Sequence, residues 1–299
     1  MEKHDRLALK QMVLERYELF KFNHSRVQRF LRDPWRTIKF YIMTAFSYIK
    51  PFKVKYRTLW GDTMVYYLPE GNQICYYGFF EADLTNFLIN FLQDGDVFID
   101  IGAHVGFYTV LASNLVGATG SVHSFEPTPR TFGSLRENAR PHSNVCVNNF
   151  AVLDEEKTIN FVDYGPRYSA YNSFRDRIAT DVDFLKRGAT PIMVKTIVLD
   201  HYCEVNNIKP SFVKIDAEGA EHLILDGMKN LLETARPVIS IEAAGEEEWQ
   251  VNCQKSIDLL LGHDYLPFEL SIRGELSVHQ VKDCYKYDNL IFIPREKAV

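Results

Sequence analysis

The chain has 299 residues, of which 46% are hydrophobic and 24% are charged, and this composition fits one large globular domain with an appendage. Its formal net charge of −5 excludes the overall basic character of proteins that bind nucleic acids over a broad surface, so we expect no nucleic-acid partner. The charge is uneven, because residues 1–57 hold 14 lysines and arginines against 5 acids, a balance of +9, and the remainder carries −14. We therefore predict a basic extension over residues 1–60 and an acidic main domain over residues 61–299.

The cysteines are scattered, and no pair has the Cys-x-x-Cys spacing of metal or redox motifs. They stand at Cys75, Cys146, Cys203, Cys253 and Cys284. Free thiols in a reducing compartment are the simplest interpretation. The opening segment 1–6 is too charged for a secretory signal peptide. These features predict a cytoplasmic protein.

The basic extension is predicted to be helical, with one helix over 6–22 and a second that starts at Asp33-Pro34, an N-cap followed by a first-turn proline. The cations that recur through it are Arg26, Arg29, Arg32, Arg36 and Lys39. The apolar run that follows is shorter than the roughly 20 residues that span a bilayer. Such a segment can lie peripherally on the inner membrane face. It can equally pack on the main domain or on a second subunit, and the sequence leaves these alternatives open.

Apolar runs, glycines and prolines predict alternating strands and helices throughout the main domain. We expect strands at 63–68, 97–101, 121–125, 145–150, 193–198, 212–215, 237–241, 265–269 and 289–294. We expect helices at 82–92, from 107 onward, and at 130–140, 199–206, 219–232 and 256–261. This alternation is typical of an α/β fold with a parallel sheet.

The most informative segment is a buried strand that ends in Asp100, a turn with Gly102 and Gly106, and a helix that begins at Phe107. His104 stands where the dinucleotide fingerprint has a second close glycine, which argues against a pyrophosphate pressed onto this helix. An acid ahead of the turn suits a cationic ligand instead. S-adenosylmethionine (SAM), with its ammonium and sulfonium groups, is such a ligand.

A second acid follows at the spacing of a ribose contact. Glu126 ends the next strand, 20 residues after Gly106, where a doubly wound unit places the acid that accepts hydrogen bonds from ribose hydroxyls. Glu126 could also act as a cap-like residue ahead of the next helix. After the third strand, Asn149 and the residues up to Ala151 would border the adenine, although Asn149 is equally typical of a plain turn.

Further acids follow the later strands. Lys214 lies within an apolar strand that leads to Asp216 and Glu218, and the next strand ends in Glu242. Because the carboxyl ends of parallel strands meet at one edge of a sheet, these side chains should gather beside Asp100. Clustered carboxylates repel each other, so they usually face a cation, a metal or polar substrate groups. Lysine is costly inside a central strand unless it is paired.

Residues 163–190 interrupt the alternation of strands and helices with an irregular stretch rich in tyrosine and arginine. A long irregular insertion in a compact domain is usually functional or disordered. Tyrosine and arginine together suit a sugar or an anionic substrate. The alternative is an ordinary surface loop.

These motifs together resemble the FkbM family of SAM-dependent methyltransferases. The segments that carry the resemblance lie at 100–106, 125–127, 214–221 and 236–242, and the similarity extends over roughly 75–294. The resemblance implies a Rossmann-like class I methyltransferase fold: a seven-stranded, mostly parallel sheet with one antiparallel strand and helices on both faces. It also implies methylation of hydroxyl groups, commonly on sugars or secondary metabolites. His104 departs from the pattern, because the family usually has asparagine there.

The resemblance implies that the glycine turn holds the methionine end of SAM, that Glu126 holds the ribose, and that Lys214, Asp216 and Glu218 lie near the transferred methyl. The expected cofactor-binding residues are Glu81, Asp100, Gly102, Ala103, His104, Gly106, Glu126, Pro127, Asn149, Phe150, Ala151 and Asp216. The expected catalytic residues are Lys214, Asp216, Glu218 and Glu242, with Asp216 favoured as the base.

The sequence therefore predicts a SAM-dependent O-methyltransferase that acts on a hydroxyl of a glycan, polysaccharide or lipid-linked sugar. Two other hypotheses remain open at this stage: a nicotinamide-dependent sugar oxidoreductase, and a non-catalytic membrane-associated adaptor. A divalent metal across the clustered acids fits the oxygen ligands that hard cations prefer. The sequence decides neither this metal nor the oligomeric state.

Overall fold

The computed structural model describes residues 1–20, 25–169, 172, 189–244, 247–282, 285 and 287–298, and the structural statements below concern these residues. The helices are α1 (Lys3–Phe20), α2 (Arg26–Arg32), α3 (Pro34–Ile49), α4 (Asn72–Tyr77), α5 (Ala82–Phe91), α6 (Phe107–Val116), α7 (Pro129–Ala139), α9 (Leu199–Asn206), α10 (Glu221–Asp226), α11 (Lys229–Thr234), α12 (Glu247–Gly262) and the short η3 (Arg295–Lys297). The strands are β1 (Phe52–Arg57), β2 (Thr63–Leu68), β3 (Val97–Ile101), β4 (Ser121–Phe125), β5 (Val145–Asn148), β6 (Ala151–Val152), β7 (Thr158–Asp163), β8 (Thr190–Ile197), β9 (Phe212–Ile215), β10 (Val238–Ala244), β11 (Tyr265–Leu270), β12 (Leu276–Val278) and β13 (Tyr287–Pro294).

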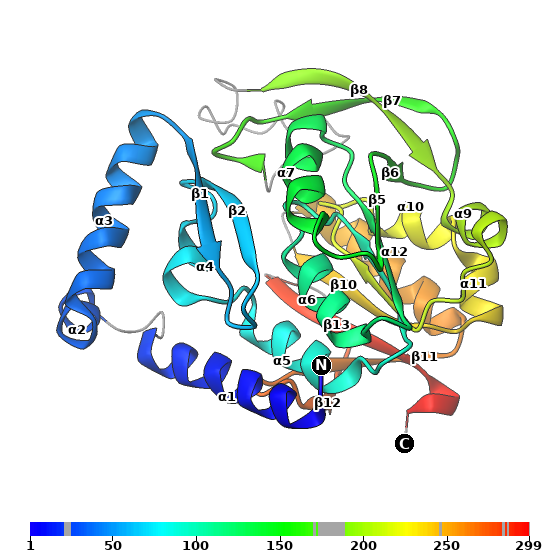
Figure 1. Cartoon of the computed structure of the whole chain (residues 1–299). Coiled ribbons are helices and arrows are strands. Elements are labelled where there is room, and N and C mark those ends of the chain that lie inside the picture. Colours follow the sequence, from blue (N-terminus) through cyan, green and yellow to red (C-terminus); the bar gives the residue numbers. More distant parts are fainter. Residues whose placement is uncertain are drawn as a thin grey trace.

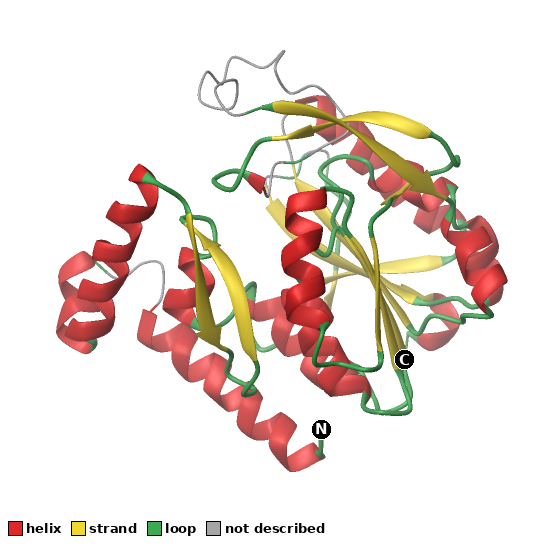
Figure 2. Ribbon diagram, turned by 45° about the horizontal axis from the view of Figure 1, so that its top comes forward, coloured by secondary structure: helices red, strands yellow, loops and turns green. Residues whose placement is uncertain are grey.

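The main sheet has the strand order β12-β11-β13-β10-β9-β3-β4-β5, and helices cover both of its faces (Figures 1 and 2). The run from β10 to β5 is parallel, whereas β13 pairs antiparallel with both β10 and β11. This arrangement confirms the expected Rossmann-like α/β class. Within the described residues the sheet has eight strands instead of the expected seven, because the short β12 adds to its edge.

The core lies in two layers, one on each face of this sheet. Residues of α9 to α12 fill one layer, and residues of α1, α5 and α6 fill the other. The central strand β9 is buried along its whole length, so it carries a continuous apolar run rather than an alternating one. Lys214 is the exception in β9, and the parallel register places it directly opposite Asp100 of β3.

The N-terminal segment is packed against the main domain. Leu9 and Val13 of α1 are buried in the same core layer as α5 and α6. The antiparallel pair of β1 and β2 follows α3. The division at residue 60 stays a prediction, and it falls between the two strands of this hairpin. Among the described helices, none combines the length and apolar character needed to cross a bilayer.

The predicted start of the second helix is confirmed. Asp33 caps α3 by accepting a hydrogen bond from the backbone N–H of Arg36 at 3.0 Å, and Pro34 occupies the first helical position. The four described cysteines are free thiols, Cys284 lies outside the described residues, and the reducing compartment stays a prediction.

Three sequence-based boundaries need correction. The helix expected at 219–232 is two helices, α10 and α11, which are separated by Gly227 and Met228; Gly227 packs its backbone against the carbonyl of Leu153, where an added Cβ would lie 2.5 Å from the oxygen. The strand expected at 145–150 ends at Asn148. The helix expected at 256–261 is the second half of the longer α12.

The insertion expected at 163–190 is framed by an antiparallel pair, β7 and β8, which forms a small second sheet with β6 (Figure 1). Residues 170, 171 and 173–188 of this insertion lie outside the described residues. Its first described part, from Asp163 to Ser169, runs toward the carboxyl ends of the main parallel strands, where Ser169 contacts His104.

Candidate active site

The glycine turn after β3 is fixed by contacts on two sides. The backbone N–H groups of Gly102 and Ala103 both donate to the carbonyl of Phe125 at the end of β4, at 3.1 and 3.0 Å. Gly102 has a φ of +74°, and a Cβ there would lie 1.8 Å from the carbonyl oxygen of Asp216. Only glycine fits this close approach, so the turn brings the ends of β3 and β9 together.

Beneath this turn, Asp100 is almost fully buried. Its Oδ2 accepts a hydrogen bond from the Thr109 hydroxyl of α6 at 2.6 Å. Its Oδ1 has no hydrogen-bond partner among the described residues and lies 4.0 Å from Nζ of Lys214. Burial raises the pKa of Asp100, and the charge of Lys214 partly offsets this effect. The expected role of Asp100 at the methionine end of SAM stays a prediction, since its carboxylate lies below the turn.

Lys214 is the cation that balances the acids of this edge. Its Nζ donates to Oδ2 of Asp216 at 2.9 Å and lies 5.3 Å from the ring centre of Tyr108. Burial works against the charged ammonium, but Asp216 and Asp100 outweigh it and raise the pKa of Lys214 above its ordinary value. The buried lysine is therefore paired, as its position inside a central strand requires.

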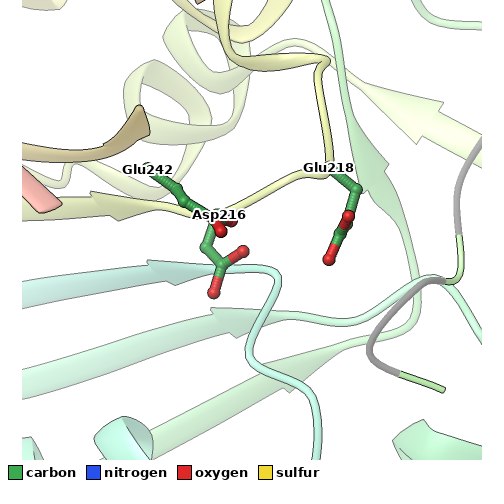
Figure 3. Close-up of side chains that lie close together, drawn as sticks. All are labelled: Asp216, Glu218 and Glu242. Atoms are coloured by element: carbon green, nitrogen blue, oxygen red, sulfur yellow. The ribbon is translucent and has the colours of Figure 1, made fainter. Parts of the chain in front are cut away.

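Figure 3 shows that Asp216, Glu218 and Glu242 lie close together, from the loop after β9 and from β10. One oxygen from each carboxyl group lies within 4.8 Å of the others. The predicted gathering of these three acids at one edge is thus present in the structure. Glu221, which follows in the same segment, is instead used locally, because it accepts hydrogen bonds from the N–H groups of Ala217 and Gly219.

Asp216 and Glu242 have pKa values that are shifted in opposite directions. Burial and the negative charges of Asp216 and Glu218 raise the pKa of Glu242 to about 11. For Asp216, burial favours the neutral acid, but the pairing with Lys214 and the hydrogen bond from Glu242 outweigh it, so its pKa lies below the ordinary value. At neutral pH, Glu242 is therefore protonated and donates to an ionised Asp216. The two carboxyl groups titrate as a pair rather than independently.

Glu126 follows β4 and is also buried, with 6% of its surface exposed. Its carboxylate accepts hydrogen bonds from the backbone N–H groups of His104 and Thr128, at 3.1 and 2.9 Å. Burial raises the pKa of Glu126 to about 7, although His104 and these hydrogen bonds oppose the rise. The structure thus ties the predicted ribose acid directly to the glycine turn.

Asn149 uses its side chain to hold the neighbouring loop. Its amide nitrogen donates to the carbonyls of Glu126 and Pro127, at 2.8 and 3.0 Å. This geometry favours the turn alternative for its side chain. Phe150, half-buried, and Ala151, the first residue of β6, continue the same loop. Their proposed contact with the adenine stays a prediction.

His104 belongs to a cluster that the sequence did not reveal. Its Nε2 lies 2.7 Å from the Ser169 hydroxyl and 3.5 Å from a carboxylate oxygen of Glu70, and Ser169 also donates to Glu70. Burial lowers the pKa of His104, but the charges of Glu70, Glu126 and Asp216 outweigh it, so the net shift is upward. The histidine thus joins the turn to the insertion and to the segment after β2.

The structure also reveals a hydrogen-bond partner for Glu81 that the sequence did not indicate. It precedes α5 with a φ of +38°, and its carboxylate accepts a hydrogen bond from the Tyr108 hydroxyl at 2.6 Å. Tyr108 in turn lies against Lys214. Glu81 therefore faces the same buried charges as Asp100 and Asp216, and its negative charge contributes to the raised pKa of Lys214.

The profile of the methyltransferase FkbM domain matches residues 100–267 of the chain. The hexuronic acid methyltransferase AglP of Haloferax volcanii is 30% identical over 161 residues, which cover 53% of this chain and 61% of AglP. The 31-O-demethyl-FK506 methyltransferase FkbM of Streptomyces tacrolimicus is 28% identical over 95 residues, which cover 32% of this chain and 36% of that protein. The chain thus spans less than two thirds of the length of either relative.

Solved structures of methyltransferases also match. Methyltransferase FkbM from Methylobacillus flagellatus superimposes with a TM-score of 0.46 at 12% identity, over 97% of this chain and 59% of that one. An O-methyltransferase from Bacillus cereus superimposes with a TM-score of 0.40 at 14% identity, over 71% of this chain and 79% of that one.

Proposed function

Because the chain belongs to the FkbM methyltransferase family, we propose that it transfers a methyl group from SAM to a hydroxyl oxygen of a carbohydrate. The observation that carries this proposal is the placement of Asp216. It is an ionised carboxylate at a strand end, held by Lys214 and flanked by acids that attract hydroxyl donors. The relationship to a hexuronic acid methyltransferase supports a sugar as the acceptor. The free thiols support a cytoplasmic site of action.

The residues present fit the cofactor. Gly102 brings the turn against the carbonyl of Asp216, so Asp100, Glu126 and Asp216 all lie next to the glycine turn, where acids suit a ligand that carries a sulfonium and an ammonium. Glu126 would accept hydrogen bonds from the ribose hydroxyls. When bound, SAM supplies a methyl group that is already activated for transfer.

The protein must then align the acceptor and remove its proton. Asp216 accepts the hydroxyl proton as the bond between the acceptor oxygen and the methyl carbon forms and the bond between carbon and sulfur breaks. Lys214 keeps Asp216 ionised and oriented, and Glu242 donates a hydrogen bond to the same carboxylate. Methylated sugar and S-adenosylhomocysteine are the products, and the proton leaves through Asp216.

A hexuronic acid offers two kinds of oxygen, a hydroxyl and a carboxylate. The surroundings of Asp216 favour the hydroxyl, because Glu218 lies beside it and would repel an acceptor carboxylate. A hydroxyl can instead donate to these acids. We therefore propose an ether rather than an ester as the product.

The same three acids fit a divalent cation, since Asp216, Glu218 and Glu242 offer oxygen ligands within 4.8 Å of one another. Such a cation would orient neighbouring sugar hydroxyls. The proton transfer to Asp216 does not need it, because Lys214 already holds this carboxylate ionised. We expect methyl transfer to survive treatment with EDTA. A complete loss that Mg²⁺ restores would assign the three acids to a cation instead.

The proposal is tested first by calorimetric titration of the protein with SAM and, separately, with NAD. SAM binding that is lost in Asp100→Ala, with no NAD binding, is the expected result. Transfer of labelled methyl to a disaccharide that contains glucuronic acid is then compared with transfer to its neutral glucose counterpart. NAD binding without SAM binding would contradict the proposal and favour an oxidoreductase.

Asp216→Asn tests the base. We expect it to bind SAM while turnover falls by about 10²- to 10⁴-fold, the usual contribution of a general base. Asp226→Asn, at the exposed end of α10, is the matched control and should keep full activity. The transferred label should resist mild alkali, as an ether does. Release by alkali would show an ester and overturn the hydroxyl assignment.

A further inference from the structure

Helix α3 carries a stripe of large apolar side chains on its outer side. Trp35, Ile38, Ile42, Phe46 and Ile49 recur at intervals of three or four residues, so they share one face of the helix. This face is open to solvent, with Trp35 82% exposed, Phe46 63% exposed and Ile49 80% exposed. In Figure 1, α3 runs along the edge of the molecule, on the side away from the main sheet.

The inner face of the same helix combines half-buried apolar side chains, such as Phe40 with its ring centre 4.5 Å from that of Tyr76, with small buried polar ones. Thr37 and Ser47 are 2% and 0% exposed, and they follow the same helical spacing on the opposite side. Thr37 contacts the Tyr76 hydroxyl of α4 at 3.1 Å, and Ser47 donates to the carbonyl of Thr44 at 2.8 Å. The outer face of the helix is therefore apolar in addition to the inner one, whereas an ordinary surface helix turns a polar face to water. Its outer face needs a partner outside the described part of the chain.

Cations accompany this stripe. A cavity of about 350 Å³ opens beside Trp35, between α3, β1 and α4, and its walls include Arg36, Lys39, Lys55 and Tyr56. The described residues that line it include no acid. Arg36 also donates to the carbonyl of Tyr76, which fixes the guanidinium at the inner end of this cavity. An apolar stripe with aromatic side chains and adjacent cations matches the two layers of a membrane interface.

The preceding helix α2 also exposes apolar side chains. Val27 and Leu31 are exposed, and Arg26 and Arg32 lie on the same short helix. Arg32 donates to the carbonyls of Glu18 and Leu19, which fastens α2 to the end of α1. We name the exposed residues of α2 and α3 with Lys39 and Lys55 the α2–α3 face.

We infer that the α2–α3 face docks on the surface of an anionic phospholipid bilayer. The apolar stripe enters the boundary between headgroups and acyl chains, while Lys39, Lys55 and their neighbours meet lipid phosphates. A second copy of the chain fits this face less well, because a symmetric dimer would place the same cations against each other. The inference stands independently of the proposed function.

The α2–α3 face is connected to the candidate active site through the insertion. Arg167, in the described part of the insertion, donates to the carbonyl of Tyr48 near the end of α3 and lies 6.0 Å from the centre of its ring. Two residues later, Ser169 contacts His104. Docking through α3 therefore holds the insertion side of the site close to the headgroups. If the proposed function is correct, a sugar carried on a lipid is the acceptor that this placement suits.

The test is flotation of the full chain with vesicles of phosphatidylcholine alone and of phosphatidylcholine with about one third phosphatidylglycerol. We expect the protein to float with the anionic vesicles and to be released by high salt. The double variant Ile42→Glu/Phe46→Glu should bind about tenfold more weakly or worse. The matched control Val205→Glu/Val251→Glu introduces the same charges at exposed apolar positions of α9 and α12 and should bind like the unchanged protein.

Fluorescence of Trp35 gives a second readout. Its emission should shift to the blue with anionic vesicles, and Trp35→Phe should remove this shift. Equal binding of the Ile42→Glu/Phe46→Glu variant and the unchanged protein would overturn the inference. So would a failure to bind anionic vesicles at low salt. A dimer in analytical ultracentrifugation that this variant disperses, without vesicle binding, would assign the face to a second copy instead.

Discussion

The acidic edge of the main sheet and the α2–α3 face place side chains in opposite kinds of unfavourable environment. At the sheet edge, Asp100 and Lys214 are charged groups removed from water and Asp216 is half-buried, and each finds a partner on a neighbouring strand or loop. On α3, apolar side chains such as Trp35 and Ile49 remain in water. The cost of burying charge at the sheet edge is offset by ion pairs within the chain. The cost of exposing apolar side chains on α3 can be offset only by contact with another surface. The comparison separates a site that the fold itself stabilises from a surface that needs a partner.

The largest expected effect comes from breaking the balance at the sheet edge. Lys214→Met would leave the buried Asp100 and the half-buried Asp216 without their cation, and removal of one member of a buried ion pair costs about 3–5 kcal/mol of unfolding free energy. Denaturant unfolding followed by circular dichroism measures this loss. Lys229→Met removes an exposed cation that pairs with Asp226 and should leave the unfolding curve unchanged. Similar curves for both variants would contradict a buried, paired Lys214.

The next effect concerns the close approach of the two strand ends. Gly102→Ala adds a Cβ that meets the carbonyl of Asp216 at a positive φ, and we expect a loss of about 1–3 kcal/mol in stability together with weaker SAM binding. Thermal unfolding and calorimetric titration measure the two losses. Gly133→Ala in α7 has nothing within 4 Å of the added Cβ, and should stabilise the protein by about 0.5–1 kcal/mol.

Glu126 predicts a pH dependence of cofactor binding. Its pKa is raised to about 7 by burial, so the folded protein keeps this proton at pH values where a free glutamate has lost it. The ionised carboxylate is the form that accepts hydrogen bonds from ribose, so SAM binding should be about tenfold weaker at pH 6 than at pH 8. Calorimetry at both pH values tests this. Glu126→Gln should remove the difference; a difference that persists in Glu126→Gln would exclude Glu126 as its source.

The raised pKa of Glu126 also sets the sign of its contribution to stability. Ionisation of this buried acid is less favourable in the folded than in the unfolded protein, so the contribution is fully present below the unfolded pKa near 4.5 and is lost as the pH rises through about 7. Glu126→Gln should therefore flatten the stability profile between these values. Thermal unfolding across this range is the measurement.

The smallest effect is expected on the α2–α3 face. Phe46→Gln replaces an exposed side chain, so the free energy of unfolding should change by less than about 0.5 kcal/mol. Denaturant unfolding is again the measurement. A loss as large as that of Lys214→Met would show that Phe46 is part of the folded core and would remove the contrast between the two regions.

The sequence predicted the parts of the site that lie on consecutive strand ends. Asp100, Glu126, Asp216 and Glu242 could be placed together because parallel strands end at one edge and the acids follow apolar runs. The sequence predicted that Lys214 has a charged partner, since a lysine inside a central strand requires one, but it did not identify that partner. The register of β3 and β9 then identifies Asp100 as the residue opposite it.

What the sequence missed depends on contacts between distant segments. Glu70 and Ser169 are far apart in the chain and carry no motif, so nothing local marked them as neighbours of His104. Tyr108 looked like an ordinary residue of an apolar helix. The short β12 is exposed along its length and lacks the apolar pattern of a core strand. In each case the missing information is the tertiary arrangement rather than a propensity of the residue itself.

The contact of Arg167 with Tyr48 links the two regions that were compared above. A ligand that displaces Ser169 would also change the contacts of Arg167 with the end of α3. A surface that binds α3 would, through the same contacts, change the position of Ser169. Thermodynamic linkage makes such coupling reciprocal: the factor by which attachment to a surface changes acceptor affinity equals the factor by which the acceptor changes attachment. The affinity of the protein for the surface would then depend on whether acceptor is bound. Protein with an empty site and protein with an occupied site would stay on the surface for different times.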